Sequence, residues 1–274
     1  GTAEADSTVT LLSSGVAIGT TTATGGTFSF TTPTLADSNY VLTVTATDAA
    51  GNISAASSAL NITVDTTAPG KPSITTTTTL TKDSTPTIEG IAEAGSTVKL
   101  FNGSTELGST TADGTTGAYT ITPAALSDGA YALTVKATDE AGNTSAASDA
   151  LPITVDATEP AQPAITTTTA LTNDATPTIA GTAEAGSTVT LLNGEVALGT
   201  TTANGEGQFL ITTSTLADSN YVLTVTATDA AGNISAASSA LNITVDTTAP
   251  AKPLITTTTS LTKDSTPTIE GVAE

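Results

Sequence analysis

The stretch AYALTVKATDEAGN, residues 130–143, decides the fold class of this chain. Apolar and polar side chains alternate along it, and one face carries Tyr131, Leu133, Val135 and Ala137. A period of two is typical of a half-buried β-strand, whereas a helix needs a period near 3.6. The polar, glycine-containing end of the stretch is typical of a tight loop. Residues 130–143 therefore predict a strand followed by a loop.

Short segments of the same kind lie on both sides of this strand. Thr and Val dominate them, and these β-branched side chains favour pleated strands. Turn dipeptides such as Asn102-Gly103 and Asp128-Gly129 separate the segments and supply the positive φ of hairpin ends. We predict strands at residues 73–79, 85–92, 97–102, 106–111, 118–122, 130–138 and 145–155. This pattern indicates an all-β fold, the immunoglobulin-like seven-stranded β-sandwich.

The loop sequence at the end of residues 130–143 recurs with a period of about 90 residues. Asp139–Asn143 has counterparts at Asp48–Asn52 and Asp229–Asn233. Self-similarity at a fixed period is the signature of a tandem array. We therefore expect sandwich domains in a linear array. They are a partial domain over residues 1–66 that lacks its first strand and most of its second, complete domains over 67–156 and 157–246, and the first two strands of a further domain over 247–274.

Both ends of the chain fall inside a repeat. Such ends are expected of a piece taken from a longer array. They are also expected of a fibre subunit whose C-terminal strands complete the first domain of the next copy, a head-to-tail contact that propagates. Both explanations remain open at the level of sequence.

The composition excludes several kinds of chemistry. The 274 residues contain no Cys and no His, which rules out His- and Cys-based catalytic triads, zinc sites with these ligands, and disulfides. With 26 acidic and 6 basic residues, the net charge is −20, so we expect no binding to nucleic acid or to anionic membrane surfaces. No apolar run approaches the roughly 20 residues that span a bilayer, so no membrane insertion is expected. Oxygen ligands remain, and these suit hard cations such as calcium.

Several motifs of the second repeat carry a resemblance to a known family. They are TPTIEG at residues 85–90, AEAGSTV at 92–98, ATDEAGNTS at 137–145, and VD at 155–156 with Pro160 and Pro163 shortly after. With these motifs the chain resembles bacterial immunoglobulin-like repeats over its whole length. Such repeats fill the extender regions of giant adhesins that are exported by type I secretion. The resemblance implies a secreted protein at a bacterial cell surface, a role in adhesion or biofilm, and calcium at the domain junctions.

The acidic residues of each repeat are placed where they can meet the linker from the repeat before. In an immunoglobulin-like topology, the loops after the second and sixth strands lie at the end where the first strand begins. Glu93 closes the second strand, Asp139 and Asn143 frame the later loop, and Asp65 ends the preceding repeat. Together they offer the oxygen ligands that calcium prefers. The candidate calcium ligands are Glu4, Asp48, Asn52, Asp65, Glu93, Asp139, Asn143, Asp156, Glu184, Asp229, Asn233, Asp246 and Glu274.

Plain turn chemistry is the alternative explanation of these acids, because Asp and Asn are common loop residues and exposed acids keep proteins soluble. A weaker candidate site lies at the opposite end of the sandwich. Asp83 and Asp128 lie there in two neighbouring loops. Its counterparts are Asp174 with Asp218, and Asp264 alone. Two carboxylates make a thin calcium site, so an acidic turn is the preferred explanation there.

These observations favour a structural role over an enzymatic one. The same acids recur at junctions rather than in a single cleft, so a glycosidase that uses two carboxylates is not expected. The leading prediction is a calcium-braced extender of a large surface adhesin or fibre. Its partners are neighbouring repeats of the same chain and, in a fibre, other copies. The alternative is a binding module for a glycan or a host protein, although a chain without Trp offers few surfaces for sugar stacking.

Overall fold

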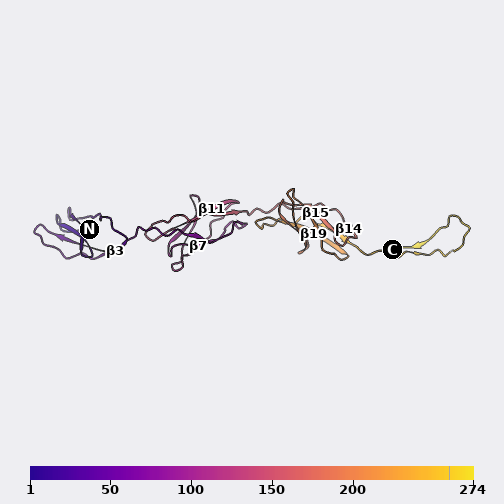
Figure 1. Ribbon diagram of the computed structural model, residues 1–274, viewed down its shortest axis with the longest axis horizontal. Coiled ribbons are helices and arrows are strands. Elements are labelled where there is room, and N and C mark those ends of the chain that lie inside the picture. The colour runs from indigo at the N-terminus through magenta and orange to yellow at the C-terminus, as the bar shows by residue number, and fades with distance from the viewer. Residues whose placement is uncertain (259) are drawn as a thin grey trace. The chain divides into compact units, whose positions relative to one another are not determined.

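The computed structural model describes residues 1–258 and 260–274. Thr259, which ends a run of threonines in the last predicted strand pair, lies outside the described residues. The described chain consists of strands and loops (Figure 1). None of its described residues forms a helix with the length and apolar character needed to cross a lipid bilayer.

Contacts between residues divide the chain into two compact units. The first unit holds Gly1–Thr79, Thr85–Leu126 and Ala130–Ile153, and the second holds Leu80–Ser84, Ser127–Gly129 and Thr154–Glu274. The division passes through the second repeat. One of its loops and one of its turns therefore group with the third repeat and with the linker that joins the two.

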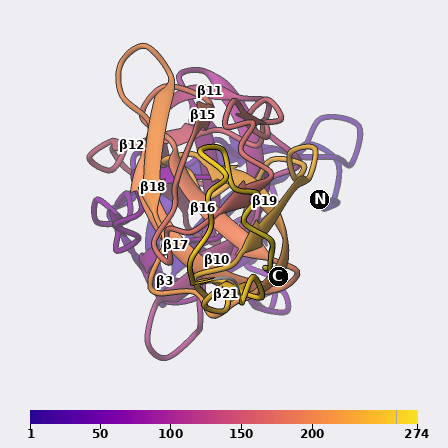
Figure 2. The same cartoon turned by 90° about the vertical axis from the view of Figure 1, so that its right-hand side faces the viewer.

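The third repeat lies wholly within the second unit and shows the complete architecture. One sheet has the order β13 (Ala164–Ile165), β15 (Thr178–Thr182) and β18 (Gln208–Thr212). The other has the order β14 (Leu171–Thr172), β20 (Leu241–Val245), β19 (Ser219–Thr228), β16 (Thr188–Asn193) and β17 (Val196–Thr202). Figure 2, turned by 90°, labels β15 and β18 of the first sheet and β16, β17 and β19 of the second. Strands of both sheets contribute to one core, which confirms the predicted all-β, immunoglobulin-like sandwich.

The same strand order recurs in the second repeat, as β10-β7-β5 and β6-β12-β11-β8-β9. These strands are β5 (Ser73–Ile74), β6 (Leu80–Thr81), β7 (Ile88–Ile91), β8 (Thr97–Asn102), β9 (Thr105–Thr111), β10 (Ala118–Ile121), β11 (Gly129–Thr138) and β12 (Leu151–Val155). The first repeat has the sheet β2-β1-β3-β4, made of β1 (Thr8–Ser13), β2 (Val16–Thr22), β3 (Ser38–Thr47) and β4 (Leu60–Val64). Near the C-terminus, β21 (Leu254–Ile255) pairs antiparallel with β22 (Gly271–Val272).

The first strand of the second repeat, predicted over residues 73–79, is wrong in its extent. The chain forms β5, leaves that sheet, and then forms β6. β5 pairs antiparallel with β7, whereas β6 pairs parallel with β12, so the two halves belong to different sheets. Between them the Thr76 hydroxyl acts as an acceptor in place of a strand carbonyl and takes the Glu89 N–H at 2.8 Å. Thr167 does the same for Ala180 at 2.7 Å in the third repeat.

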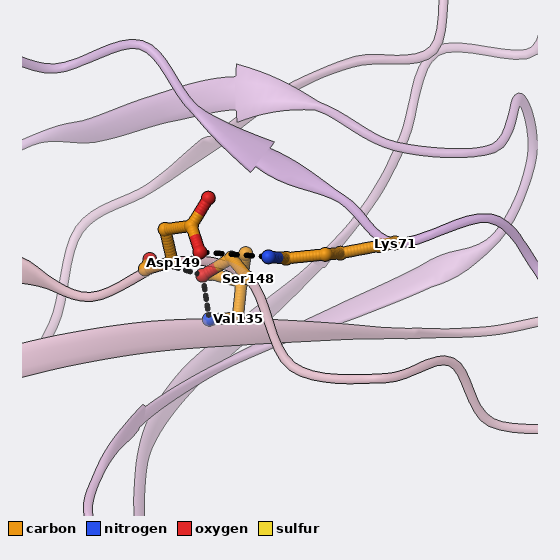
Figure 3. Close-up of polar contacts among 4 residues, drawn as sticks. All are labelled: Lys71, Val135, Ser148 and Asp149. Atoms are coloured by element: carbon orange, nitrogen blue, oxygen red, sulfur yellow. Dashed lines mark hydrogen bonds and ion pairs between the residues drawn. The ribbon is translucent and has the colours of Figure 1, made fainter.

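The last strand of the second repeat also begins later than predicted, at Leu151 rather than at Ser145. Serine side chains take the place of the backbone acceptors that a paired strand would offer to β11. The Ser148 Oγ accepts the Val135 N–H at 3.0 Å, and the Ser145 Oγ accepts the Ala137 N–H at 2.9 Å. Figure 3 shows the first of these bonds. Both serines are buried, so the edge of β11 stays satisfied although no regular strand pairs with it there.

The alternation predicted for residues 130–138 is observed in β11. Its inward side chains are fully buried, with 0% exposure for Leu133, Val135 and Ala137. β19 of the third repeat buries Leu223, Val225 and Ala227 to the same degree. Leu, Ile, Val and Ala dominate both cores. Because these cores contain few large side chains, each buried aliphatic residue accounts for a substantial share of the stability of its repeat.

We expect Leu223→Ala to destabilise the third repeat by about 2–5 kcal/mol, because it removes buried contacts and leaves a cavity. Val222→Ala is the matched control, since Val222 is the next residue of the same strand and is 53% exposed. The control should cost less than about 1 kcal/mol. Urea unfolding of both variants, followed by circular dichroism, measures the difference. Equal losses of stability would contradict the assignment of the core face.

Candidate functional site

One carboxylate holds closed the loop that follows β11. Asp139 Oδ1 accepts the backbone N–H of Asn143 at 2.8 Å, and Oδ2 accepts its side-chain Nδ2 at 2.8 Å. Gly142 has a φ of 97°, a left-handed conformation that suits glycine. The side-chain bond from Asn143 is the largest of the effects that hold the pKa of Asp139 below its ordinary value. The carboxylate therefore stays ionised and orients the Asn143 amide.

The oriented amide contacts the segment that arrives from the preceding repeat. Asn143 Nδ2 donates its second hydrogen to the carbonyl oxygen of Asp65 at 3.1 Å. In the third repeat, Asn233 Nδ2 donates to the Asp156 carbonyl at 2.7 Å, and Asn233 is 6% exposed. Asn52, their counterpart in the first repeat, is exposed. The loop and linker residues that the sequence placed together thus meet at two junctions, through an amide and a carbonyl.

The glutamates of the predicted calcium sites take no part in these bonds. Glu93 and Glu184 are exposed, and the backbone carbonyl of Glu93 closes a turn by accepting the N–H and the hydroxyl of Ser96, at 3.1 and 2.7 Å. Glu274 Oε2 accepts the Ala251 N–H at 2.8 Å. The second-strand glutamate therefore reaches the linker directly in the last partial repeat.

Three of the predicted ligands line one cavity in the first repeat. Glu4, Asp48 and Asn52 border a space of about 470 Å³ at the end where the second-strand and sixth-strand loops meet. Over the residues that the structure describes, however, no three Asp or Glu side chains gather closely enough to hold a metal ion. The candidate ligand atoms are all oxygens, which suit a hard cation. The hydrogen bonds that the structure shows at the junctions are donated by the asparagine amides.

A second set of bonds reaches the linker from the repeat that it leaves. Asp128, in the turn before β11, accepts the Ala157 N–H at 2.9 Å and the Thr158 hydroxyl. Asp218 accepts the Thr247 N–H at 2.9 Å and the Thr248 hydroxyl at 2.7 Å. Asp37 does the same for Thr66 and Thr67, at 3.0 and 2.6 Å. Linker hydroxyls are the largest of the effects that hold the pKa of these three carboxyls below its ordinary value.

A half-buried tyrosine fixes the turn that carries this aspartate. Tyr221 donates its hydroxyl to the Ala217 carbonyl at 3.0 Å, directly before Asp218. Tyr40 bonds Ala36 at 2.9 Å in the first repeat. This arrangement is the tyrosine corner of immunoglobulin-like folds. It holds the aspartate beside the last strand, where the linker begins.

From sequence, Asp128 and Asp218 were predicted to belong to a weak ion site, and Asp37 was not predicted to have a role. The structure assigns all three to linker binding, while Asp174 accepts the Thr176 N–H at 2.8 Å and closes its own loop. An ion shared by Asp83 and Asp128 stays a prediction. A signal that could have revealed linker binding is the sequence after the last strand, Asp-Thr-Thr or Asp-Ala-Thr, because its N–H and hydroxyl donors need a nearby acceptor.

The first residues after the linker are tied to the segment before the last strand. Lys71 Nζ lies 2.7 Å from Asp149 Oδ1; the Lys71 side chain is about half exposed and that of Asp149 is exposed (Figure 3). In the third repeat Gln162, the counterpart of Lys71, donates to the Ala237 carbonyl in the same segment. An exposed ion pair of this kind contributes about 0–1 kcal/mol. These contacts align the first strand and are a minor part of the junction.

Two curated relatives are similar to the chain in sequence. Exoglucanase B of Cellulomonas fimi is 35% identical over 257 residues, which covers 84% of this chain and 22% of that protein. Chitinase A1 of Niallia circulans is 40% identical over 129 residues, which covers 43% of this chain and 18% of that protein. The chain thus spans about a fifth of the length of the curated relatives that it matches.

Solved structures of low sequence identity are also similar. The fibronectin(III)-like modules of Clostridium thermocellum CbhA match with a TM-score of 0.42 and 22% identity, over 63% of this chain and 92% of theirs. The BSP domain of a biofilm-associated protein matches with a TM-score of 0.28 and 20% identity, over 79% of this chain and 44% of that one.

A family model matches most of the chain. The model of the bacterial Ig-like domain matches residues 1–66, 72–157 and 162–247. Each matched segment contains the loop with its Asp and Asn and the turn with the linker-binding Asp. The chain belongs to the bacterial Ig-like domain family, whose model it matches three times in tandem.

Proposed function

We propose that this chain is a run of extender repeats in a large extracellular bacterial protein, where it holds the parts on either side of it apart. The observation that carries the proposal is the bonding of the linkers. An aspartate of the repeat behind and an asparagine of the repeat ahead both bind the linker at Asp65–Thr67 and again at Asp156–Thr158. A chain that only needed a flexible connection would gain nothing from such bonds.

A role without catalysis is part of this proposal. The acids of the junctions bind linker hydrogens and loop amides, and they are not paired as an acid and a base around a cleft. The two curated relatives carry the names of enzymes with different substrates, an exoglucanase and a chitinase. A segment shared by proteins of different activity supports a module that serves the whole protein rather than its chemistry.

A bacterial surface location follows from the same reasoning. The family is one of bacterial Ig-like modules, and the resemblance of the repeat motifs to adhesin extenders supports a secreted surface protein. The charge of −20 keeps such a chain soluble and disfavours association with other acidic surfaces. We therefore place the chain in a secreted adhesin or surface fibre, with neighbouring repeats as its first partners.

We also propose that calcium binds at the junctions between repeats. Asp65, Glu93, Asp139 and Asn143 would hold it at one junction, and Asp156, Glu184, Asp229 and Asn233 at the next. Bound calcium would neutralise these carboxylates and add ligand bonds between linker and loop. The support is the oxygen-only donor set and the cavity that Glu4, Asp48 and Asn52 share in the first repeat.

Calcium should raise the thermal unfolding temperature of the full chain relative to the same chain in EGTA. A ligand at about 100 times its Kd stabilises the folded state by about 2.7 kcal/mol. Replacing Glu93 and Glu184 by Gln should abolish most of this increment, since both side chains lie outside the hydrogen bonds of the junction. Glu195→Gln, an exposed acid in a hairpin turn, is the matched control. Identical unfolding curves in calcium and EGTA would refute the calcium proposal and leave the extender role standing.

The extender role predicts that the chain lengthens by a constant step with each added repeat. Inserting a second copy of residues 157–246 after residue 246 should increase the maximum dimension by about 40 Å, because strands of about 7–10 residues rise about 3.3 Å per residue and the loops and the linker add the rest. Small-angle X-ray scattering of the parent and lengthened chains measures this step. A much smaller step would show that successive repeats fold back on one another, and the extender role would be wrong.

A further inference from the structure

The third repeat begins and ends with strands that pair with each other in parallel. β14 lies near its start and β20 at its end, and two residues of each form the ladder. Beside this ladder, the Thr244 N–H donates to the Ala170 carbonyl at 2.8 Å, and the Asp246 N–H donates to the Thr172 carbonyl at 3.0 Å. All these residues belong to the second compact unit. The first and last parts of the repeat are therefore joined directly by backbone hydrogen bonds.

Parallel pairing decides how this ladder responds to tension along the chain. A pull on the preceding linker reaches β14 from its N-terminal side, and a pull on the following linker reaches β20 from its C-terminal side. In a parallel pair these are opposite ends, so the strands are drawn past each other along their axes. Because the bonds of a parallel ladder are evenly spaced along the strands, they then share the load. In an antiparallel pair both pulls would act at one end, and the bonds would break one after another.

The two strands differ in what else holds them. β20 is anchored in the core, with Ile243 at 2% and Val245 at 1% exposure. In β14, Leu171 is 67% exposed, so apolar burial contributes little to keeping this strand in place. The strand before it, β13, pairs with β15 in the other sheet, and its detachment would leave β14 and β20 joined. The bonds between β14 and β20 are thus the connection that must break before tension reaches the core.

The loop after β14 fixes the far end of this strand. The Thr172 hydroxyl accepts the Asp174 N–H at 3.0 Å, and Asp174 Oδ1 accepts the Thr176 N–H at 2.8 Å and its hydroxyl at 3.0 Å. Side chains that bind backbone groups two residues further on close a tight turn. β14 therefore resists being drawn out of its register by a pull from its N-terminal side.

We propose that the parallel pair of β14 and β20 is a clamp that lets the repeat carry tension along the chain without unfolding. The same arrangement recurs in the second repeat, where β6 pairs parallel with β12 and the Asp156 N–H donates to the Thr81 carbonyl at 2.9 Å. The use of such a clamp rests on the proposed extender role, since an extender transmits force between the parts that it holds apart. The clamp itself is measured on one repeat, so its failure leaves the lengthening experiment unaffected.

Optical tweezers can load the third repeat alone within the full chain, because the chain has no cysteine of its own. Ala161→Cys and Ala249→Cys provide the two attachment points, at exposed positions on either side of the strands of this repeat. The measured quantity is the unfolding rate at a fixed force, since forced unfolding is governed by that rate.

Two proline substitutions remove one bond of the clamp each. Thr244→Pro deletes the N–H that binds the Ala170 carbonyl, and Asp246→Pro deletes the N–H that binds the Thr172 carbonyl. Each should raise the unfolding rate under force by about 3- to 10-fold, the effect of one lost hydrogen bond. Asp246 lies beyond the end of β20, so Asp246→Pro keeps the test valid even where Thr244→Pro disturbs folding.

Asn242→Pro is the matched control for both substitutions. Asn242 lies on β20, ahead of the residues that bind β14, and it is exposed. Pro152 occupies its place in the second repeat, where β12 forms with that proline in it. The unfolding rate of Asn242→Pro under force should therefore stay close to that of the parent chain.

Leu223→Ala separates load bearing from general stability. This change removes buried contacts of β19 but no bond between β14 and β20. It should therefore raise the unfolding rate under force less than Thr244→Pro and Asp246→Pro do, although it lowers stability in urea. Equal rates in all three proline variants, or a larger rise in Leu223→Ala than in both Thr244→Pro and Asp246→Pro, would overturn the proposal.

Discussion

The hydrogen bonds from linker donors to a single aspartate at the end of each repeat are the interaction on which the junction depends. A peptide that leaves a folded domain normally turns its N–H groups to water and keeps its torsional freedom. Here Asp128 takes up an N–H and a hydroxyl from consecutive linker residues. The linker therefore continues the body of the repeat. Its carbonyl at Asp156 is then presented in a defined place, where Asn233 can reach it.

The same use of side chains in place of backbone partners runs through each sandwich. Ser145 and Ser148 accept N–H groups of β11 where no strand pairs with it, and Thr76 accepts one where the first strand changes sheets. Such hydroxyls satisfy backbone groups that would otherwise be costly to bury. This explains how a chain rich in Ser, Thr and Ala, with aromatics at 3%, closes two-layer domains. Small side chains also let the segment before the last strand lie close to β11.

Much of the fold could be predicted from sequence because its strongest signals are local. The alternation in residues 130–138 gave β11 and its buried face, and other central strands lie within a few residues of their predicted bounds. The split of residues 73–79 could not be foreseen, because a run of threonines suits either sheet equally and the choice depends on partners far along the chain. The late start of β12 has the same cause, since Ser145 looks like a strand residue until its hydroxyl is seen as an acceptor.

The candidate site was predicted in part. The recurrence of Asp139–Asn143 beside a linker correctly indicated a junction, and the structure joins Asn143 to Asp65. The sequence could not show that the Asn143 amide donates to the Asp65 carbonyl, because an amide contact and a calcium site need the same polar residues. Asp37 escaped notice for a different reason. A lone Asp before a strand is an ordinary turn residue, and only its distance to Thr66 and Thr67 reveals its role.

Hydrogen exchange of individual linker amides, measured by NMR on the full chain in EGTA, tests most directly whether the linkers are bound. Ala157 and Thr247 donate their N–H groups to Asp128 and Asp218 at 2.9 Å. We predict slow exchange at both, and fast exchange at Gly70 and Ala161, which lie in neighbouring parts of the linkers. Equally fast exchange at all four amides would mean that the aspartates do not hold the linkers, and the account of the junction would be wrong.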